Sequence, residues 1–218
     1  MISVTNLSRR FDGVCALEGV SFQVADGTAL AIVGPSGSGK TTLLRLIAGL
    51  EKPDAGEISL DGHVASRPGW CLAPHRRGVG LVFQSSALWP HMTVAQNILF
   101  GLHDLPRQEA QGRLRELLAL TGLEGLERRY PHQISGGQAR RVALARTLAP
   151  APRYLLLDEP LTNLDARLRE GMLNLILAAV RQTSATLLYV THQREEAAQV
   201  ARSALVLESG RVLGVEEL

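Results

Sequence analysis

A glycine-rich run, Gly34-Pro35-Ser36-Gly37-Ser38-Gly39-Lys40-Thr41, constrains the fold of this chain more than any other feature. The five residues before it, 29–33, are all apolar, and this lack of alternation is typical of a strand buried on both faces. The residues after it, from Thr42 to Leu50, place leucine and isoleucine at helical spacing. The sequence therefore predicts a strand, a glycine loop and a helix in direct succession, which is the context of a phosphate-binding loop.

The residue types of this loop suit a nucleotide. Glycines let the backbone curl so that successive N–H groups point at one anion, and the following helix adds the positive end of its dipole. In such a loop the Lys40 ammonium reaches the β- and γ-phosphates, and the Thr41 hydroxyl is a ligand of Mg²⁺. We therefore expect the nucleotide to be bound by Gly34, Pro35, Ser36, Gly37, Ser38, Gly39, Lys40, Thr41 and Thr42.

A second motif places two acids, Asp158 and Glu159, at the end of the apolar run that starts at Tyr154. Such a run predicts a buried strand, and ligands of open parallel sheets bind at the carboxyl ends of the strands. We expect Asp158 to hold Mg²⁺ through water. We expect Glu159 to orient or deprotonate the water molecule that attacks the γ-phosphate of the nucleotide. By itself this motif is also compatible with a solvated strand end, and the phosphate loop is what favours the catalytic interpretation.

A third motif, Ser135-Gly136-Gly137-Gln138, begins a predicted helix that runs to Leu148. Serine at the N-cap and glutamine three residues later form a capping box. A capping box does not require two glycines, whose missing side chains allow the phosphate of another molecule to approach the N–H groups. We expect both roles, a capped helix and an outward-facing anion site.

The remaining pattern predicts alternating strands and helices, and therefore a parallel α/β sheet. Asp12-Gly13, Asp26-Gly27 and Asp61-Gly62 each predict a hairpin in the first third of the chain. The middle section is helical, with Leu114, Leu117, Leu118 and Leu120 on one predicted helix. The later elements are expected to be strands at Leu155–Asp158, Thr186–Thr191 and Ala204–Leu207 and a helix at Ala166–Gln182.

We expect a single domain over residues 1–218. Its α/β core and antiparallel β subdomain would comprise residues 1–87 and 150–218, and a helical subdomain would comprise residues 88–149. Arg140, Arg141 and Arg146, on the helix after the third motif, are expected on a solvated face.

Composition limits the partners. The chain has 23 Lys and Arg and 21 Asp and Glu, and this near-neutral balance gives no electrostatic argument for a nucleic-acid partner. The two cysteines, Cys15 and Cys71, lack metal-ligand spacing and are expected to be reduced thiols. The sequence has no apolar run of about 18–20 residues and no signal-peptide pattern, so we expect another molecule to anchor the chain if it works at a membrane.

In this order, the three motifs resemble those of ATP-binding-cassette (ABC) ATPases, and the resemblance covers nearly the whole chain. It implies a P-loop NTPase fold with a RecA-like core, an antiparallel β subdomain and a helical subdomain. It also implies ATP and Mg²⁺, and a head-to-tail dimer in which the signature of one copy, Ser135, Gly136, Gly137 and Gln138, completes the ATP site of the other. A homodimer is expected, since one chain carries both halves of the site. Ile134 stands where the family usually has leucine and keeps the apolar anchor.

Smaller motifs follow in the family order. Gln84, in Val82-Phe83-Gln84, resembles the Q-loop residue that contacts Mg²⁺ and the attacking water. His192 resembles the switch histidine at the γ-phosphate, and Asp165 ends a segment that resembles the D-loop at the dimer interface. Phe11 stands in the place of the aromatic residue that stacks on adenine, where the family more often has tyrosine. The alternative for Phe11 is a core residue near a hairpin.

The resemblance implies that ATP hydrolysis drives a solute, by import, through separate membrane permease subunits, with a solute-binding protein as a further partner. Tyr130–Gln133, Arg141–Arg146 and Phe83–Val94 resemble binding-protein-dependent importers, whose branch serves sulfate, iron, polyamine and maltose uptake. We expect a peripheral protein at the cytoplasmic face of the cell membrane, with a docking surface around Leu88 and Trp89, and no nucleic-acid partner. Many members of the branch carry a C-terminal regulatory domain, and because the chain ends at Leu218 we expect no regulation through one.

Two alternatives remain at this stage. One is a soluble ABC ATPase that acts on nucleic acid or ribosomes, although such relatives usually have tandem cassettes, coiled-coil insertions or zinc modules. The other is a mechanical actuator of a membrane complex that transports nothing.

Overall fold

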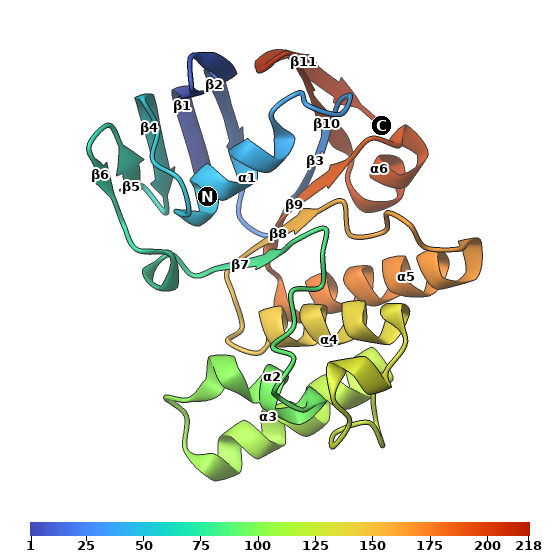
Figure 1. Cartoon of the computed structure of the whole chain (residues 1–218). Helices are drawn as coiled ribbons and strands as arrows, with labels where there is room; N and C mark the ends of the chain where they lie inside the picture. Colours follow the sequence, from blue (N-terminus) through green and yellow to red (C-terminus); the bar gives the residue numbers. More distant parts are fainter. The chain divides into compact units, whose positions relative to one another are not determined.

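An antiparallel sheet of five strands, in the order β2-β1-β4-β5-β6, forms the first part of the chain in the computed structural model, which describes residues 1–218 (Figure 1). Two of the predicted Asp-Gly hairpins are confirmed, at Asp12-Gly13 and Asp61-Gly62. Both residues of each pair have positive φ, as the tight hairpin turn requires. The strands are β1 (Ile2–Phe11), β2 (Val14–Val24), β4 (Ala55–Leu60), β5 (His63–Arg67) and β6 (Trp70–Cys71).

The hairpin predicted at Asp26-Gly27 is wrong. This turn leads from β2 into β3 (Ala29–Val33), which belongs to a different sheet. Only Gly27 has positive φ here, whereas a type I′ hairpin needs it at both central residues. The Gly27 N–H donates to the Thr186 hydroxyl at 2.9 Å, so the turn connects to the second sheet.

The second sheet has six strands in the order β11-β10-β3-β9-β8-β7. β3 pairs in parallel with β9 and β10, and β8 pairs in parallel with β9, which confirms the predicted parallel sheet. β11 is antiparallel to β10. Every residue of β8 and β9 is buried, as their apolar sequences indicate. The further strands are β7 (Val79–Val82), β8 (Tyr154–Asp158), β9 (Thr186–Thr191), β10 (Ser203–Glu208) and β11 (Arg211–Glu217).

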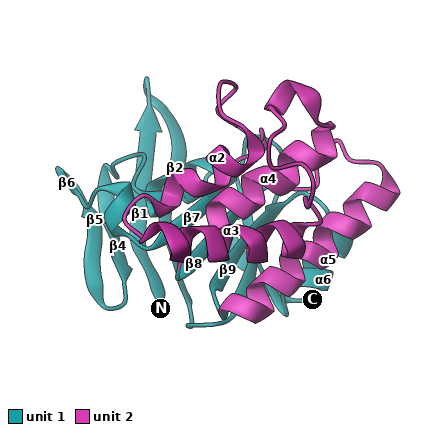
Figure 2. Ribbon diagram, turned by 90° about the horizontal axis from the view of Figure 1, so that it is seen from below, with its two compact units in different colours: residues 1–81, 153–159, 184–218 teal, residues 82–152, 160–183 magenta.

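The chain divides into two compact units, coloured separately in Figure 2. Unit 1 comprises Met1–Leu81, Arg153–Glu159 and Ser184–Leu218, and unit 2 comprises Val82–Pro152 and Pro160–Thr183. In unit 1 a single hydrophobic core joins side chains of both sheets to one face of helix α1 (Lys40–Ala48). Helix α6 (Arg194–Val200) packs against β3 and β9, with Ala197 in a second small cluster. Buried apolar faces on both α1 and the sheet therefore fix the position of the glycine loop between β3 and α1.

Arg77 is a buried cation in the core of unit 1, 3% exposed, directly after the short 3-10 helix η1 (Pro74–Arg76). Its guanidinium donates to the carbonyls of Leu46 and Ile47, in the last turn of α1, at 3.2 and 2.8 Å. It also donates to the Ala65 carbonyl at 2.7 Å and to the Ser66 hydroxyl at 2.6 Å, both in β5. Arg77 thus joins the end of α1 to the antiparallel sheet.

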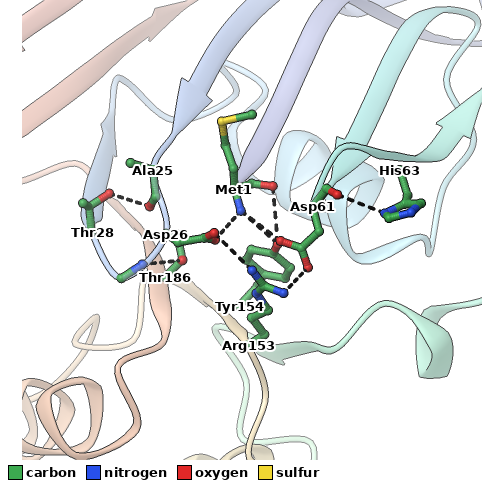
Figure 3. A network of polar contacts seen from close by, with 10 residues as sticks. Met1, Ala25, Asp26, Thr28, Asp61, His63, Arg153, Tyr154 and Thr186 are labelled. Carbon is green, nitrogen blue, oxygen red and sulfur yellow. Dashed lines mark hydrogen bonds and ion pairs between the residues drawn. The ribbon is translucent and has the colours of Figure 1, made fainter.

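A polar network at the surface of unit 1 links the amino group of Met1 to three segments that are distant in sequence (Figure 3). Arg153 forms ion pairs with Asp26 at 3.1 Å and with Asp61 at 2.5 Å. The Tyr154 hydroxyl donates to Asp61 at 2.5 Å, and burial together with this bond raises the pKa of Tyr154. The network connects the turn before β3, the β4–β5 turn and the start of β8.

Unit 2 is helical, with α2 (Val94–Leu99), η2 (Phe100–Leu102), α3 (Arg107–Thr121), η3 (Pro131–Gln133), α4 (Gly136–Leu148) and α5 (Ala166–Thr183). The helices predicted around Leu114, from Gly136 to Leu148 and from Ala166 are confirmed. Leu114, Leu117 and Leu118 of α3 are buried. α4 packs against α2, α3 and α5. No helix of the chain is both long and apolar enough to span a bilayer.

The solvated face predicted for Arg140, Arg141 and Arg146 is wrong. All three side chains are partly buried and donate to backbone carbonyls of unit 2. Arg140 bonds Pro160 at 2.8 Å, and Arg146 bonds Ala87 at 2.9 Å. Burial lowers the pKa of Arg140 and of Arg146. These arginines connect segments of unit 2 and leave no basic stripe on α4.

Candidate nucleotide site

The glycine loop ends in a helix start that has no side-chain cap. Gly39 is the N-cap of α1, with φ of 103°, and no side chain accepts a bond from the first turn. That turn also contains no acidic residue. Its N–H groups, which have no partner within the helix, are therefore available to an anion, and the helix dipole favours one there.

Two glycines of the loop lie directly against backbone from other elements. A Cβ at Gly34 would lie 2.0 Å from the Leu207 carbonyl oxygen in β10, and one at Gly39 would lie 2.5 Å from the Ala16 carbonyl oxygen in β2. The Gly210 N–H also donates to the Ser38 carbonyl at 3.1 Å. The loop is thus seated on both sheets of unit 1, and no side chain fits at either glycine.

Lys40 lies inside the loop and is only 5% exposed. Its ammonium donates to the carbonyls of Gly34 and Pro35 at 2.8 and 2.7 Å. Burial lowers the pKa of Lys40, while the nearby carboxylates of Glu159 and Asp158 act in the opposite direction. The cation that would contact phosphate is therefore held at the loop by backbone oxygens.

Strand register brings the predicted motifs of unit 1 to one edge of the parallel sheet. Asp158 of β8 is aligned with Val190 of β9, and Val33, which precedes the loop, is aligned with Thr191. Glu159, the start of the glycine loop and His192 each follow directly after these paired ends. Parallel pairing thus gathers the loop, the two acids and the histidine at the edge where ligands of such sheets bind.

Asp158 and Thr41 provide two oxygen atoms that suit a hard divalent cation. The Thr41 hydroxyl donates to Asp158 Oδ1 at 3.1 Å. Asp158 is 4% exposed, and burial raises its pKa. The chain has no cluster of three or more His, Cys, Asp or Glu side chains that could hold a metal ion. A Mg²⁺ ion here would take its other ligands from phosphate and water, which is how this ion usually binds in such sites.

Glu159 and His192 face each other at 3.5 Å between Glu159 Oε2 and His192 Nδ1. Glu159 has a left-handed backbone, with φ of 46°, and its N–H donates to the Val190 carbonyl at 3.0 Å. This conformation is uncommon for a residue with a Cβ and costs of order 1–2 kcal/mol. The turn after β8 therefore directs the Glu159 side chain toward the end of β9.

Ser38, one of the predicted nucleotide-binding residues, has a feature that the sequence does not show. It is 2% exposed, and its buried hydroxyl oxygen has no hydrogen-bond partner in the protein. An unpartnered buried hydroxyl within a loop of free N–H groups suits a ligand that accepts hydrogen bonds. This observation supports the fit between the loop and a phosphate group.

Phe11 ends β1 and is 38% exposed, so the alternative of a core residue is excluded. Arg9 lies over its ring, with Cζ 4.5 Å from the ring centroid. Sequence reasoning missed Arg9, because nothing in its neighbourhood distinguishes it from a solvated arginine of a polar strand.

The other predicted site residues lie in unit 2. Gln84 follows β7 and is exposed, and Asp165 accepts a bond from the Leu168 N–H at 2.9 Å at the start of α5. The predicted capping box of α4 is confirmed: the Ser135 hydroxyl accepts from the Gln138 N–H at 3.2 Å, and the Ser135 N–H donates to Gln138 Oε1 at 2.9 Å. A Cβ at Gly136 would meet nothing within 4 Å, and one at Gly137 would meet only Leu168.

Comparison with known proteins finds relatives of one family. The family model for ABC transporters matches residues 17–162. The sulfate/thiosulfate import ATP-binding protein CysA 2 of Chromobacterium violaceum is 49% identical over 97% of this chain and 57% of its own length. The Fe(3+) ions import ATP-binding protein FbpC of Escherichia coli is 43% identical over 98% of this chain and 61% of its own length.

A solved structure, the dimeric post-hydrolysis state of the ATP-binding cassette MJ0796 bound to ADP and phosphate, superimposes with a TM-score of 0.88 at 30% identity, covering 100% of this chain and 99% of the other. The chain thus spans about three fifths of the length of the two curated relatives and nearly all of this cassette. On the strength of its motifs, its fold and these relatives, the chain belongs to the ABC transporter family.

Proposed function

We propose that this chain binds ATP with Mg²⁺ and hydrolyses it. The observation that carries the proposal is the convergence of the uncapped glycine loop, the Thr41–Asp158 pair and the Glu159–His192 pair at one edge of the parallel sheet. Each group has a function in phosphoryl transfer to water, and a structural reason for placing two acids beside a phosphate loop is hard to find, because bound phosphate repels them.

In this proposal Lys40 and the N–H groups of the loop bind the β- and γ-phosphates, and Thr41 and Asp158 hold the metal ion. When bound, Mg²⁺ neutralises charge that develops on the phosphate oxygens. Glu159 orients or deprotonates the water, and His192 donates a hydrogen bond to the γ-phosphate. Gln84 contributes a contact to the metal ion and the water. Catalysis is then mainly orientation and charge neutralisation.

The proposal includes a head-to-tail homodimer. Ser135, Gly136, Gly137 and Gln138 would complete the site of a second copy, and Asp165 would lie at the interface. Support comes from the exposed start of α4, where Gly136 has open space in place of a side chain, and from the dimeric cassette among the relatives. A second nucleotide could approach the first N–H groups of α4 closely.

We further propose that hydrolysis drives import of a solute through separate permease subunits, with a solute-binding protein, and that the chain works as a peripheral protein at the cytoplasmic face of the cell membrane. The curated relatives are import ATP-binding proteins for sulfate or thiosulfate and for Fe(3+) ions. Unit 2 offers a docking surface, formed by Leu88, Trp89 and Phe100. Trp89 and Phe100 are 43% and 53% exposed, with ring centroids 5.7 Å apart.

Asn97 supports the docking surface through hydrogen bonds to the backbone. Asn97 is fully buried, and its amide donates to the carbonyls of Trp89, Met92 and Thr93 at 3.0–3.2 Å. Its own oxygen accepts from the Trp89 N–H at 2.9 Å. Exposed aromatic side chains are enriched at protein interfaces.

The ATPase part is tested with Glu159→Gln, which keeps the shape of the side chain and removes its charge. We expect hydrolysis to fall about 10²- to 10⁴-fold, the usual contribution of a general base, while ATP binding persists and the dimer accumulates with ATP. Phosphate release and size-exclusion chromatography measure both effects. Glu195→Gln, an exposed position on α6, is the matched control. Turnover of Glu159→Gln at the normal rate would contradict the assigned role.

The transport part is tested by isolating the tagged chain from native membranes and identifying what co-purifies. We expect a multi-span membrane protein, and a solute-binding partner would indicate the substrate. Recovery only from the soluble fraction with ribosomes or nucleic acid would reject transport and leave the ATPase proposal intact.

A further inference from the structure

Arg9 and Phe11 form a cation–aromatic pair that lies outside the phosphate loop. Arg9 Cζ is 4.5 Å from the centroid of the Phe11 ring, within the range of a cation–π interaction. The Arg9 side chain is 22% exposed, whereas Phe11 keeps 38% of its surface exposed. The guanidinium thus covers one face of an aromatic ring whose remaining surface is open to solvent.

The guanidinium is also held by two acids. Arg9 Nη1 contacts Asp54 Oδ1 at 3.0 Å, and Arg9 Nη2 contacts Glu51 Oε2 at 3.3 Å. Asp54 also accepts a bond from the Arg10 backbone N–H at 2.7 Å. Both acids follow the C-cap of α1 at Gly49. The same helix that starts at the phosphate loop therefore ends next to the residues that fix Arg9.

The hairpin that carries this pair also touches the loop. Phe11 pairs with Val14 of β2, and Arg9 pairs with Leu17. A Cβ at Gly39 would lie 2.8 Å from the Leu17 side chain, so β2 and the loop are in direct contact at this register position. The exposed Phe11 ring thus belongs to a hairpin with two attachments. The hairpin contacts the glycine loop near the start of α1, and Arg9 binds Glu51 and Asp54 just after the end of α1.

We infer that Arg9 is a positioning residue for the nucleobase: it holds the Phe11 ring in a fixed orientation, so that the adenine of a nucleotide bound at the loop stacks on the face opposite the guanidinium. The inference rests on the proposed nucleotide function. An exposed phenylalanine next to a turn has rotamer freedom to lose on binding, and a ring that is already fixed avoids this entropic cost. The polar partners of the Arg9 side chain are Asp54 and Glu51, and neither belongs to the glycine loop, so we expect its effect to be confined to ligands that contain a base.

The test compares two ligands, ATP and inorganic tripolyphosphate, which has the phosphates and no base. In Arg9→Met we expect the Kd for ATP to rise about three- to fivefold, the scale of an exposed cation–π contact, and the Kd for tripolyphosphate to stay unchanged. In a Phe11→Ala background, Arg9→Met should have no further effect on ATP. Arg9→Lys keeps a cation near the ring but cannot bridge both acids, so its Kd for ATP should lie between those of the wild type and Arg9→Met.

Arg10→Met is the matched control, because Arg10 is the next residue of the strand and its exposed side chain has no hydrogen bond or ion pair. Both Kd values should stay at the wild-type level there. An equal loss of ATP and tripolyphosphate affinity in Arg9→Met, confirmed in Arg9→Lys, would mean that Arg9 supports the loop and would overturn the inference. An unchanged Kd for ATP would overturn it as well. A wild-type chain that binds neither ligand would instead reject the proposed nucleotide function, and the inference with it.

Discussion

At the scale of single residues, Asp158 shows a conflict between folding and the proposed function. Burial raises the pKa of Asp158, and the neighbouring Glu159 adds to this effect, while the Thr41 hydroxyl and Lys40 oppose it. The pKa of Asp158 is higher in the folded protein than in the unfolded chain. The contribution of protonated Asp158 to stability is therefore full below the unfolded pKa. It falls as the pH rises between the two values and stays lower above the folded pKa. The ionised side chain that a metal ion needs is therefore destabilising in the ligand-free protein at neutral pH.

Asp158→Asn should separate these two effects. The amide keeps the shape and can still accept the Thr41 bond, and it has no charge to bury. We expect the Tm of the ligand-free protein at pH 7 to rise, by about 2–4 °C for each kcal/mol relieved, and Mg²⁺-dependent ATP binding to weaken. The gain in Tm should shrink as the pH is lowered. Asp104→Asn, at a side chain that is 91% exposed, should change neither property. A lower Tm for Asp158→Asn would show that burial of the charge is not the dominant effect.

Which residues the sequence could identify depends on whether their position follows from chain order. Asp158 ends a strand that an apolar run predicts, Glu159 and His192 directly follow such strands, and parallel pairing then places all three at one edge. Arg9 and Arg77 could not be identified, because the acids that hold Arg9 and the α1 carbonyls that Arg77 bonds lie at least 30 residues away in the sequence, and basic side chains are usually solvated. Arg140 was misjudged for the same reason, since its acceptor is a carbonyl of a distant loop.

At the scale of elements, predictions held where local signals agreed. Ala29–Val33, Gly136–Leu148 and Thr186–Thr191 have the predicted bounds, because an apolar run covers each strand and a capping box marks the start of the helix. Asp26-Gly27 failed because an Asp-Gly pair predicts a reversal of the chain and says nothing about the sheet in which the next strand pairs. The burial of β3 on both faces decided that pairing.

Arg77 connects elements, so its loss should be costly. In Arg77→Met the carbonyls of Leu46, Ile47 and Ala65 would be left buried without their donor. We expect the free energy of unfolding to fall by about 2–4 kcal/mol, the range for removing one member of a buried polar network. Urea unfolding measures the change. Arg76→Met, at the exposed preceding residue, should cost less than about 0.5 kcal/mol. Equal stability of the two variants would show that Arg77 can be replaced without loss.

At the scale of the whole molecule, the chain carries its sequence motifs on two units. The glycine loop, Asp158, Glu159 and His192 belong to unit 1, and the start of α4 at Ser135 belongs to unit 2. The proposed dimer site combines the glycine loop of one copy with the start of α4 of the other. This arrangement follows from the family resemblance and not from the fold of a single copy. In the single chain, Ser135 and Gly136 at the start of α4 are exposed. A test of the dimer has to change that surface without destabilising α4.

Ser135→Asp meets this requirement, because aspartate caps a helix as well as serine does and its charge favours the helix N-terminus. The same charge would repel the γ-phosphate of a second copy. We expect a Tm at or above the wild-type value and intact ATP binding. In a chain that also carries Glu159→Gln, we expect Ser135→Asp to abolish the dimer that forms with ATP, as measured by light scattering. Ser135→Ala, which removes the cap and about 1 kcal/mol of stability, should still allow dimers to form more readily than Ser135→Asp. If Ser135→Asp forms ATP-dependent dimers as well as the wild-type residue does, the start of α4 is not at the nucleotide, and the signature acts only as a helix cap.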